Sequence, residues 1–436
     1  MQIHIVQNGD TLSSIANYYG IPMQRLESDN DLPPNYNPNI GQALIISYPE
    51  KTHIVKEGDT LLSIAEAYNT TPMQVIKFNP FLSVRENYEV NPGEELAISY
   101  VLGDKEIQVN GFTTTVINQD VLISTLPSLT YLTILNYHVL ATGDIRDIND
   151  TDIITTAKAY GVAPIMFVSS MNEQGKGSYA VTHSITSNPE VQKNLINNIL
   201  AIVKNKGYFG VNIGFYNVLD EDLPGYVSFI KNITDILNNE GYIVFVTFNP
   251  TTWRYDPNTP YNFPYYSQIG NIANYVILMT YLWQTSTMAQ FERTSPTYLK
   301  QYLDFVITQI PPEKIFIGLS RVAYDWELPY ADFETRQTFL TNATAISLAN
   351  QLGAEILFDE RTQTPYFNYN NNGVDHLVWF KDARTNQFIL NLINEYNLKG
   401  LSIWNILYYF GQTWIPIYSQ YDIENVLDNV PSEESI

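Results

Sequence analysis

The stretch FGVNIGF, residues 209–215, has the near-continuous apolar character of a strand that is buried on both faces. Seven further runs of this kind lie at 106–112, 131–137, 164–170, 243–249, 275–281, 314–320 and 401–407. Amphipathic segments such as VQKNLINNILAIVKNKG, residues 191–207, separate them. Buried strands that alternate with helices in this way predict a (β/α)8 TIM barrel, although periodicity alone also allows a doubly wound sheet.

The connection between the seventh and eighth runs is too long for a single helical crossover. Residues 348–380 combine a helix-like segment with strand-like segments. We therefore expect a small α+β insertion in the barrel, at about residues 322–380.

An internal repeat precedes the barrel. HIVQNGDTLSSIANYYGIPM, which begins at His4, recurs as HIVKEGDTLLSIAEAYNTTPM from His53, an offset of 49 residues. Each copy predicts a short strand, a Gly-Asp-Thr turn and a helix with apolar residues at helical spacing. A second short helix and a closing strand, at 43–48 or 95–100, complete a βααβ unit.

Both copies carry the pattern V-x-x-G-D-T-L-x-x-I-A and resemble LysM modules, which bind N-acetylglucosamine glycans such as peptidoglycan and chitin. Backbone groups in a shallow groove can bind an N-acetyl group without a charged side chain. The same residue types also suit a tight turn followed by an N-cap, whatever they bind. The candidate glycan-binding residues are Gly9, Asp10, Thr11, Gly58, Asp59 and Thr60.

The barrel segments include KGYFGVNIGF, VILMTY, YDWELPY (324–330), HLVWFKDART (376–385) and LKGLSIWNI. They resemble family 18 glycoside hydrolases, in particular the spore cortex-lytic N-acetylglucosaminidases of the YaaH/SleL type, which also carry two LysM modules. The similarity spans residues 1–425. It implies a (β/α)8 barrel that hydrolyses N-acetylglucosaminidic bonds.

In that family the fourth strand ends in D-x-D-x-E, where the glutamic acid protonates the glycosidic oxygen and the preceding aspartate orients the substrate's N-acetyl group. Here the segment reads N-I-G-F-Y, so Asn212, Gly214 and Tyr216 occupy the acidic positions, and Leu282 occupies a fourth. A phenol, with a pKa near 10, is a poor replacement for the acid. A relocated acid could come only from residues 220–222, which more simply form a solvated loop or helix start.

Aromatic residues at the ends of strands can still form a sugar-binding pocket. Tyr137, Tyr281 and Trp404 lie at expected carboxyl ends of barrel strands, where barrel ligands bind. Trp404 matches the tryptophan that forms the floor of the central sugar subsite in the family. The alternative is that these rings only pack the barrel. The five histidines show no metal-ligand spacing, so we expect neither a metal ion nor a cofactor.

The composition of the chain limits which partners it can bind. A net charge of −22 and a pI near 4.5 would repel nucleic acid. The absence of cysteine excludes disulfides and thiolate chemistry, and the sequence shows neither a signal peptide nor a membrane span. We expect a spore-envelope protein made in the mother-cell cytoplasm, with peptidoglycan, other envelope proteins or copies of itself as partners. Its 32 tyrosines favour assembly through interfaces.

Two functions follow from these patterns. The loss of the acidic positions favours a non-hydrolytic protein of the spore envelope that binds peptidoglycan and has an inactive glycosidase-like barrel. The alternative is an N-acetylglucosaminidase that hydrolyses spore cortex peptidoglycan during germination. In either case we expect LysM repeats at 1–49 and 50–100, a barrel at 101–427 and an acidic tail at 428–436.

Overall fold

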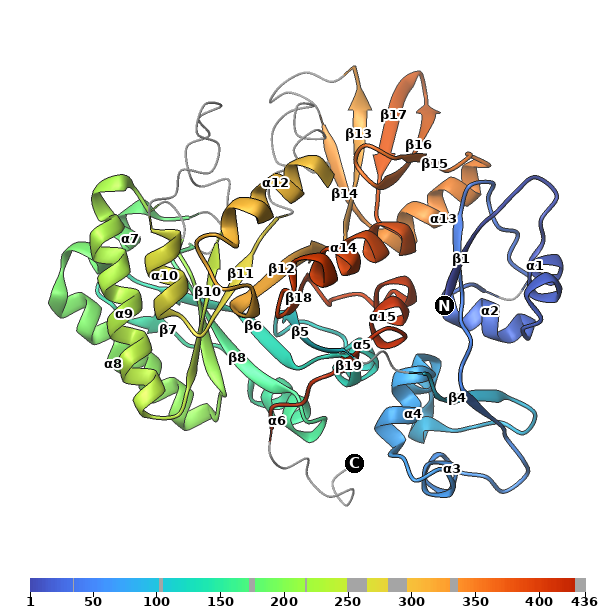
Figure 1. The fold of residues 1–436 in the computed structure, drawn as a ribbon, viewed down its shortest axis with the longest axis horizontal. Helices are drawn as coiled ribbons and strands as arrows, with labels where there is room; N and C mark the ends of the chain where they lie inside the picture. The colour runs from blue at the N-terminus through green and yellow to red at the C-terminus, as the bar shows by residue number, and fades with distance from the viewer. Residues whose placement is uncertain are drawn as a thin grey trace.

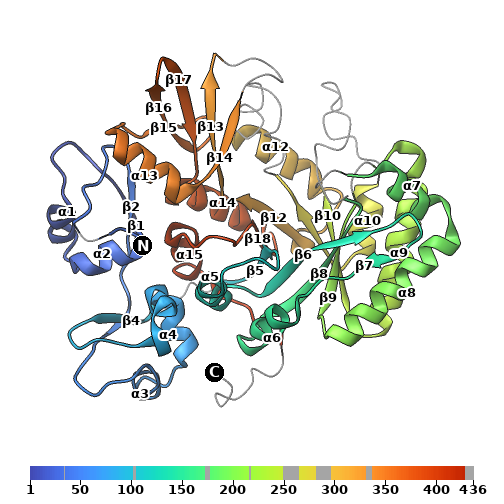
Figure 2. The same cartoon turned by 180° about the vertical axis from the view of Figure 1, so that it is seen from behind.

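A computed structural model describes residues 1–33, 35–101, 105–171, 177–215, 218–248, 265–280, 296–329 and 336–427. The two N-terminal units lie at one side of an eight-stranded barrel, and helices α7, α8 and α9 lie at the opposite side (Figures 1 and 2). No helix in the described part of the chain is long and apolar enough to cross a membrane.

Both N-terminal units have the expected βααβ order, and in each the two strands pair antiparallel. The first helix of each unit begins with a capping box, in which Thr11 bonds with Ser14 and Thr60 with Ser63. Unit one contains β1 (Gln2–Ile5), α1 (Leu12–Tyr19), α2 (Met23–Asp29) and β2 (Ala43–Ile46). Unit two contains β3 (Lys51–Ile54), α3 (Leu61–Ala67), α4 (Pro72–Phe78), η1 (Pro80–Val84), η2 (Glu86–Tyr88) and β4 (Glu95–Ser99).

The eight expected buried runs all form parallel strands, and β5 pairs with both β18 and β6 to close the barrel. The barrel strands are β5 (Glu106–Thr113), β6 (Tyr131–Val139), β8 (Ala163–Ser169), β9 (Gly210–Gly214), β10 (Ile243–Phe248), β11 (Tyr275–Leu278), β12 (Ile315–Ser320) and β18 (Gly400–Trp404). Two short strands, β7 (Ile145–Arg146) and β19 (Asp422–Ile423), extend the sheet. The (β/α)8 prediction is confirmed, and the doubly wound alternative is excluded because the sheet closes.

Helices cover the outside of this barrel. The longest, α8, begins after the Asn188 cap with a proline at its first position and ends at Gly207, whose φ of 73° permits the left-handed C-cap. The helices are α5 (Gln119–Thr125), η3 (Leu126–Ser128), α6 (Thr151–Ala159), α7 (Tyr179–Ser187), α8 (Pro189–Lys206), η4 (Asp220–Asp222), α9 (Leu223–Asn239), α10 (Tyr266–Ile272), α12 (Pro296–Val306), η7 (Pro312–Lys314), α14 (Ala383–Tyr396) and α15 (Gly411–Tyr418).

The predicted α+β insertion follows β12. Its five antiparallel strands have the order β14-β13-β17-β16-β15, and Figure 1 shows them rising above α13. The elements are β13 (Val322–Leu328), β14 (Gln337–Thr341), α13 (Asn342–Leu352), β15 (Leu357–Asp359), β16 (Thr364–Asn371) and β17 (Val374–Trp379). Since β13 begins two residues after β12 ends, the insertion is fixed next to the carboxyl ends of the barrel strands.

The first N-terminal unit is docked on the barrel through buried backbone groups. The amide of Gly411 donates to Asp31 at 2.6 Å, and the side chain of Gln412 donates to the carbonyl of Ala43 at 2.8 Å. The insertion adds a backbone bond from Ile356 to the carbonyl of Ile40, at 2.9 Å. Removing this unit would therefore expose buried polar groups of α15, so it is an integral part of the fold.

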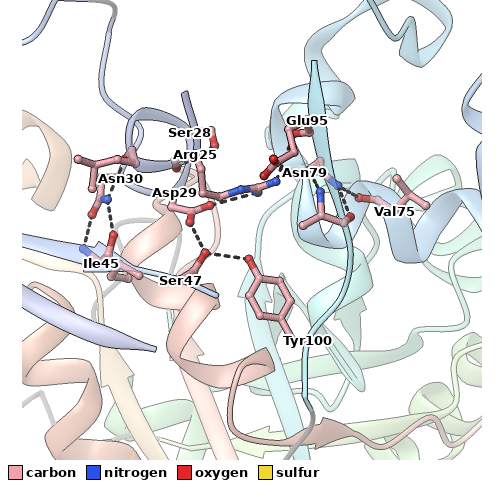
Figure 3. Close-up of polar contacts among 12 residues, drawn as sticks. Arg25, Ser28, Asp29, Asn30, Ile45, Ser47, Val75, Asn79, Glu95 and Tyr100 are labelled. Atoms are coloured by element: carbon pink, nitrogen blue, oxygen red, sulfur yellow. Dashed lines mark hydrogen bonds and ion pairs between the residues drawn. The ribbon is translucent and has the colours of Figure 1, made fainter. Parts of the chain in front are cut away.

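A buried charge pair joins the two N-terminal units (Figure 3). Arg25 lies 3.5 Å from Asp29, and its guanidinium also donates to the carbonyl of Glu95 in the second unit at 3.2 Å. The Ser47 hydroxyl donates to Asp29 and lies 3.0 Å from the Tyr100 hydroxyl. Burial raises the pKa of Asp29. Both side chains are buried, so the loss of one charge leaves the other without a counter-ion.

Arg25→Leu is expected to lower the free energy of unfolding by about 3–5 kcal/mol, because Asp29 would then be a buried and unpaired carboxylate. Arg25→Leu combined with Asp29→Asn removes both charges and keeps an acceptor for Ser47, and most of the loss should be recovered. Urea unfolding of the three proteins measures both effects. A single variant within about 1 kcal/mol of the parent would contradict this role for the pair.

Candidate functional site

The inner face of the barrel carries neutral polar groups where the strands end. Asn212, at the first acidic position of the family motif, is buried and accepts a hydrogen bond from Thr247 at 2.7 Å. Its Nδ2 has no hydrogen-bond partner among the described residues. On the other side, Asn110 donates to Ser402 at 2.9 Å and accepts from Thr133 at 2.7 Å. These side chains can orient a polar ligand, but none of them is a strong acid or base.

The position of the orienting aspartate is closed by aromatic packing. A Cβ atom on Gly214 would lie 2.3 Å from Cζ of Phe167, a distance that real contacts do not reach. Phe167 packs edge-to-face on Phe112, with ring centroids 5.7 Å apart, and Phe112 lies against Trp404 at 5.2 Å. The missing carboxylate is therefore one part of a repacked barrel interior, in which the phenylalanine ring fills the space of the missing side chain.

Three residues singled out in the sequence, Tyr216, Tyr281 and Leu282, lie outside the described residues. Trp404 ends β18 and packs, partly buried, on the cluster of residues that fills the barrel interior. Its role as the floor of a sugar pocket stays a prediction.

Tyr137 lies on the other side of the sheet, in the core between the strands and the helices. It is fully buried, and its hydroxyl donates to Asp150 at 2.6 Å. The register of β6 shifts between Ile134 and Tyr137, and Asn136 has a φ of 85°. Such a bulge changes which face of the sheet a side chain points to, so the ring of Tyr137 lies outside the barrel interior although the residue is near the carboxyl end of the strand. Its position gives no support to a role in a sugar pocket.

The loop after β9 supplies acidic side chains at the rim of the barrel. Glu221 is exposed and accepts a hydrogen bond from the Tyr179 hydroxyl at 2.7 Å. This bond raises the pKa of Tyr179 to about 12. Asp222 is buried, and its Oδ1 lies 2.7 Å from Nδ1 of His183 and accepts from Thr186 at 2.8 Å.

The side chains of His183, Glu221 and Asp222 approach one another closely enough to share a cation, since their ligand atoms lie within 4.8 Å. Sequence spacing could not reveal this grouping, because His183 belongs to α7 and the two acids to η4. Asp222 is buried, and its Oδ1 makes both of its hydrogen bonds. Glu221 is therefore the more accessible of these two carboxylates.

The Gly-Asp-Thr turns have the same side-chain network in both repeats. In the first, Asp10 accepts from the amide of Gln7 at 2.7 Å and lies 2.9 Å from Nε2 of His4, whose Nδ1 lies 3.2 Å from the Tyr19 hydroxyl. The second repeat has equivalent contacts, with Asp59 2.8 Å from Nε2 of His53. The sequence analysis missed this network, although all three of its side chains recur at the repeat offset.

Hydrogen bonds from the Gln7 amide and from His4 lower the pKa of Asp10, and those from His53 and the Lys56 amide lower that of Asp59. A lowered folded-state pKa stabilises the turn above the ordinary value of 3.8. This contribution is lost as the pH falls through the lowered pKa.

The remaining candidate residues of the turns have conformational roles. Gly9 and Gly58 have φ values of 90° and 89°, and a Cβ on either would meet nothing within 4 Å. Thr11 and Thr60 cap the helices that follow. Both roles leave the backbone of the turn free to bind a glycan. Neither role depends on glycan binding.

Comparisons with known proteins agree with this architecture. The pattern of the glycosyl hydrolases family 18 matches residues 152–408, and that of the LysM domain matches 4–47 and 53–99. The chain is 30% identical to a cortical fragment-lytic enzyme of Bacillus anthracis, over 95% of this chain and 97% of the relative. It is 27% identical to a cortical fragment-lytic enzyme of Bacillus subtilis, over 97% and 99% of the two chains.

Among solved structures, the spore cortex-lytic enzyme SleL of Bacillus megaterium superposes with a TM-score of 0.78. The two sequences are 27% identical, and the match covers 98% of this chain and 99% of that enzyme. The chain belongs to the glycosyl hydrolases family 18 and carries two N-terminal LysM domains.

The expectation of a non-hydrolytic envelope protein is contradicted by these comparisons, because relatives matched over nearly their whole length are named as lytic enzymes. That expectation rested on four positions, Asn212, Gly214 and Tyr216 after the fourth strand and Leu282 after the sixth. The family's acidic residues are absent at those positions, but a carboxylate elsewhere on the barrel rim could take their place.

The contact between Gly214 and Phe167 predicts how these positions respond to substitution. Gly214→Asp alone is expected to destabilise the protein by about 1–3 kcal/mol through overpacking. Phe167→Ala alone should cost about 3–5 kcal/mol, because it opens a cavity. The double variant should lose less than the sum of the two, since the new carboxylate would occupy the vacated space. Thermal or urea unfolding measures the coupling, and strictly additive losses would show that the two residues do not compete for space.

Proposed function

We propose that this chain is a glycoside hydrolase that cleaves N-acetylglucosaminidic bonds in spore cortex peptidoglycan, to which its LysM domains bind. The main support for this proposal is the length over which the chain matches lytic relatives. Cortical fragment-lytic relatives align over 97–99% of their length, through both LysM domains, the barrel and the insertion. The relatives are spore proteins, and we place this chain in the spore envelope. We also propose domain limits of 1–49, 50–100 and 101–427, followed by the acidic tail at 428–436.

Hydrolysis needs a proton donor for the departing sugar oxygen, and neither Gly214 nor Asn212 can supply one. The acid must therefore come from another part of the barrel rim. Glu221 is our candidate, because it follows the same strand as the family's acid and is accessible. The hydroxyl of Tyr179 holds the side chain in place. Trp404 provides an apolar ring against which a pyranose can stack.

The purified protein is expected to release reducing ends from cortex fragments. Glu221→Gln keeps the size of the side chain and removes its acid, so it should lower kcat by about 10²–10⁴-fold. Asp220→Asn, a neighbouring change in the same loop, is the matched control and should retain most of the activity. Equal activity of both variants would show that the acid lies elsewhere. The absence of any turnover by the folded parent protein would contradict the proposed function.

The two LysM domains are not equivalent in this chain. In the first, the loop before the closing strand contacts the barrel, where Asn350 donates to the carbonyl of Asn37 at 2.7 Å and Arg384 donates to the carbonyl of Gly41 at 3.3 Å. In the second, the segment just before the closing strand is held within its own domain by an ion pair of 2.6 Å between Arg85 and Glu94. Its loop touches the barrel earlier in the chain, where the Tyr88 hydroxyl lies 3.3 Å from that of Tyr160. We propose that the second domain is the principal glycan-binding module.

Matched substitutions test this asymmetry. Gly9→Ala and Gly58→Ala each place a methyl group at a φ near 90°, so both should strain their turns by about 1–2 kcal/mol. Gly58→Ala should reduce the fraction of protein retained on insoluble peptidoglycan several-fold more than Gly9→Ala does. A pull-down with both variants at equal concentration measures the difference. Equal losses, or a larger loss for Gly9→Ala, would overturn the proposal.

A further inference from the structure

Three side chains that can bind a metal ion meet after β9, where α7 packs against α9 (Figures 1 and 2). His183 belongs to α7, and Glu221 and Asp222 belong to η4, which leads into α9. One ligand atom from each side chain lies within 4.8 Å of the other two. In the described part of the chain this is the only group of three or more His, Asp or Glu side chains with that geometry.

Asp222 and His183 already lie close to the spacing of two ligands of one metal ion. The Oδ1 atom of Asp222 is 2.7 Å from Nδ1 of His183. Metal–ligand bonds of about 2.0–2.2 Å place neighbouring ligand atoms about 3 Å apart. A divalent ion can therefore replace the proton between these two atoms, and the side chains need to move by less than about 1 Å.

The charge of the Asp222 carboxylate is buried and incompletely compensated. Asp222 is 3% exposed, and its contacts with His183 and Thr186 are both made by Oδ1. Its Oδ2 has no hydrogen-bond donor among the described residues. A buried carboxylate is costly unless a positive charge lies beside it. A cation bound to Oδ1 would supply that charge, while the Thr186 hydroxyl keeps the carboxylate oriented.

Tyr179 holds the third ligand beside the histidine. Tyr179 and His183 are one helical turn apart on α7, and their ring centroids are 5.4 Å apart. The Tyr179 hydroxyl donates to Oε1 of Glu221 at 2.7 Å and lies 3.4 Å from Nδ1 of His183. Because Glu221 is exposed, its side chain can close the remaining distance without disturbing the core.

The two elements that carry the ligands are fixed to each other by backbone contact. A Cβ atom on Gly225, in the first turn of α9, would lie 2.1 Å from the carbonyl oxygen of Thr186 on α7. Only glycine allows so close an approach. The packing therefore holds His183 and the two acids at one distance, which favours a preformed site over a chance grouping of surface acids.

The donor atoms select the kind of ion. Mg²⁺ and Ca²⁺ prefer ligand shells made of oxygen, whereas imidazole nitrogen suits Zn²⁺ and other late transition ions. Two carboxylates balance the charge of a divalent ion. Three protein ligands leave one tetrahedral position open, which water can fill. The net charge of −22 also attracts cations to the protein surface.

We propose that His183, Glu221 and Asp222 bind one divalent transition-metal ion, with Zn²⁺ as the best fit. Binding of the ion does not depend on hydrolysis. One consequence rests on the proposed function: a Glu221 carboxylate that holds a cation cannot donate a proton to a sugar oxygen, so the bound ion suppresses hydrolysis. The ion and the catalytic proton thus compete for one side chain.

Calorimetric titration of the untagged full chain with Zn²⁺ tests the site without any turnover. One ion per chain is expected to bind. His183→Gln and Glu221→Gln each remove one ligand and should weaken binding at least about tenfold, since losing a group that only supports a ligand already costs about 10–100-fold. His53→Gln is the matched control and should leave the affinity unchanged. It disrupts a His–Asp pair of 2.8 Å that has no third metal-ligating side chain among the described residues.

Both substituted ligands are accessible, with the His183 side chain 47% exposed, so the two variants are expected to fold. Thermal unfolding without metal checks this. A parent protein that binds no Zn²⁺ at one-to-one stoichiometry, or binding that survives in both variants, would overturn the site. Binding of Mg²⁺ as tight as that of Zn²⁺ would overturn the assignment of the ion.

The release of reducing ends from cortex fragments tests the consequence for hydrolysis. One equivalent of Zn²⁺ is expected to lower the rate of the parent protein at least about tenfold. His183→Gln should keep its own metal-free rate at the same Zn²⁺ concentration. A zinc-loaded parent that hydrolyses at full rate would overturn the suppression. A parent that binds Zn²⁺ but shows no turnover with or without the ion would contradict only the proposed function.

Discussion

Closure of the eight-stranded sheet through β5 is the constraint on which the candidate site depends. Because β5 pairs with β18 on one edge and β6 on the other, the carboxyl ends of all eight strands meet at one rim. The parallel register places Ser320 opposite Trp404, so the chain that leaves β12 begins beside the tryptophan. Arg321 and Trp404 are therefore neighbours because of strand pairing, although their positions in the sequence differ by 83.

The barrel combines an overall similarity to lytic enzymes with an altered fourth strand. Its similarity to cortical fragment-lytic enzymes extends over nearly the whole chain, yet its fourth strand offers an amide and a glycine where the family has carboxylates. Phe167 fills the space beside Gly214, so the interior is well packed without the aspartate. Any hydrolytic chemistry must then use groups at the rim, outside the packed interior. That requirement draws attention to the loop after β9.

Much of the architecture could be predicted from the sequence because periodicity and repetition are local signals. The eight buried runs became the eight strands, and the repeat at 49 residues gave both βααβ units. The place of Tyr137 near a strand end could be predicted, but the face to which its ring points could not. A bulge in β6 interrupts the alternation of side chains, and a bulge has no signature in the residues themselves. The contact of Phe167 with Gly214 joins neighbouring strands, and residue spacing cannot reveal it.

The central claim is hydrolysis, and the fate of solvent oxygen tests it most directly. Cortex fragments would be incubated with the full chain in heavy-oxygen water, and the products analysed by mass spectrometry. The account predicts new reducing-end N-acetylglucosamine residues that carry one heavy oxygen each, formed in proportion to enzyme and time. Products whose new ends carry no solvent oxygen, or fragments that remain intact after binding, would contradict it.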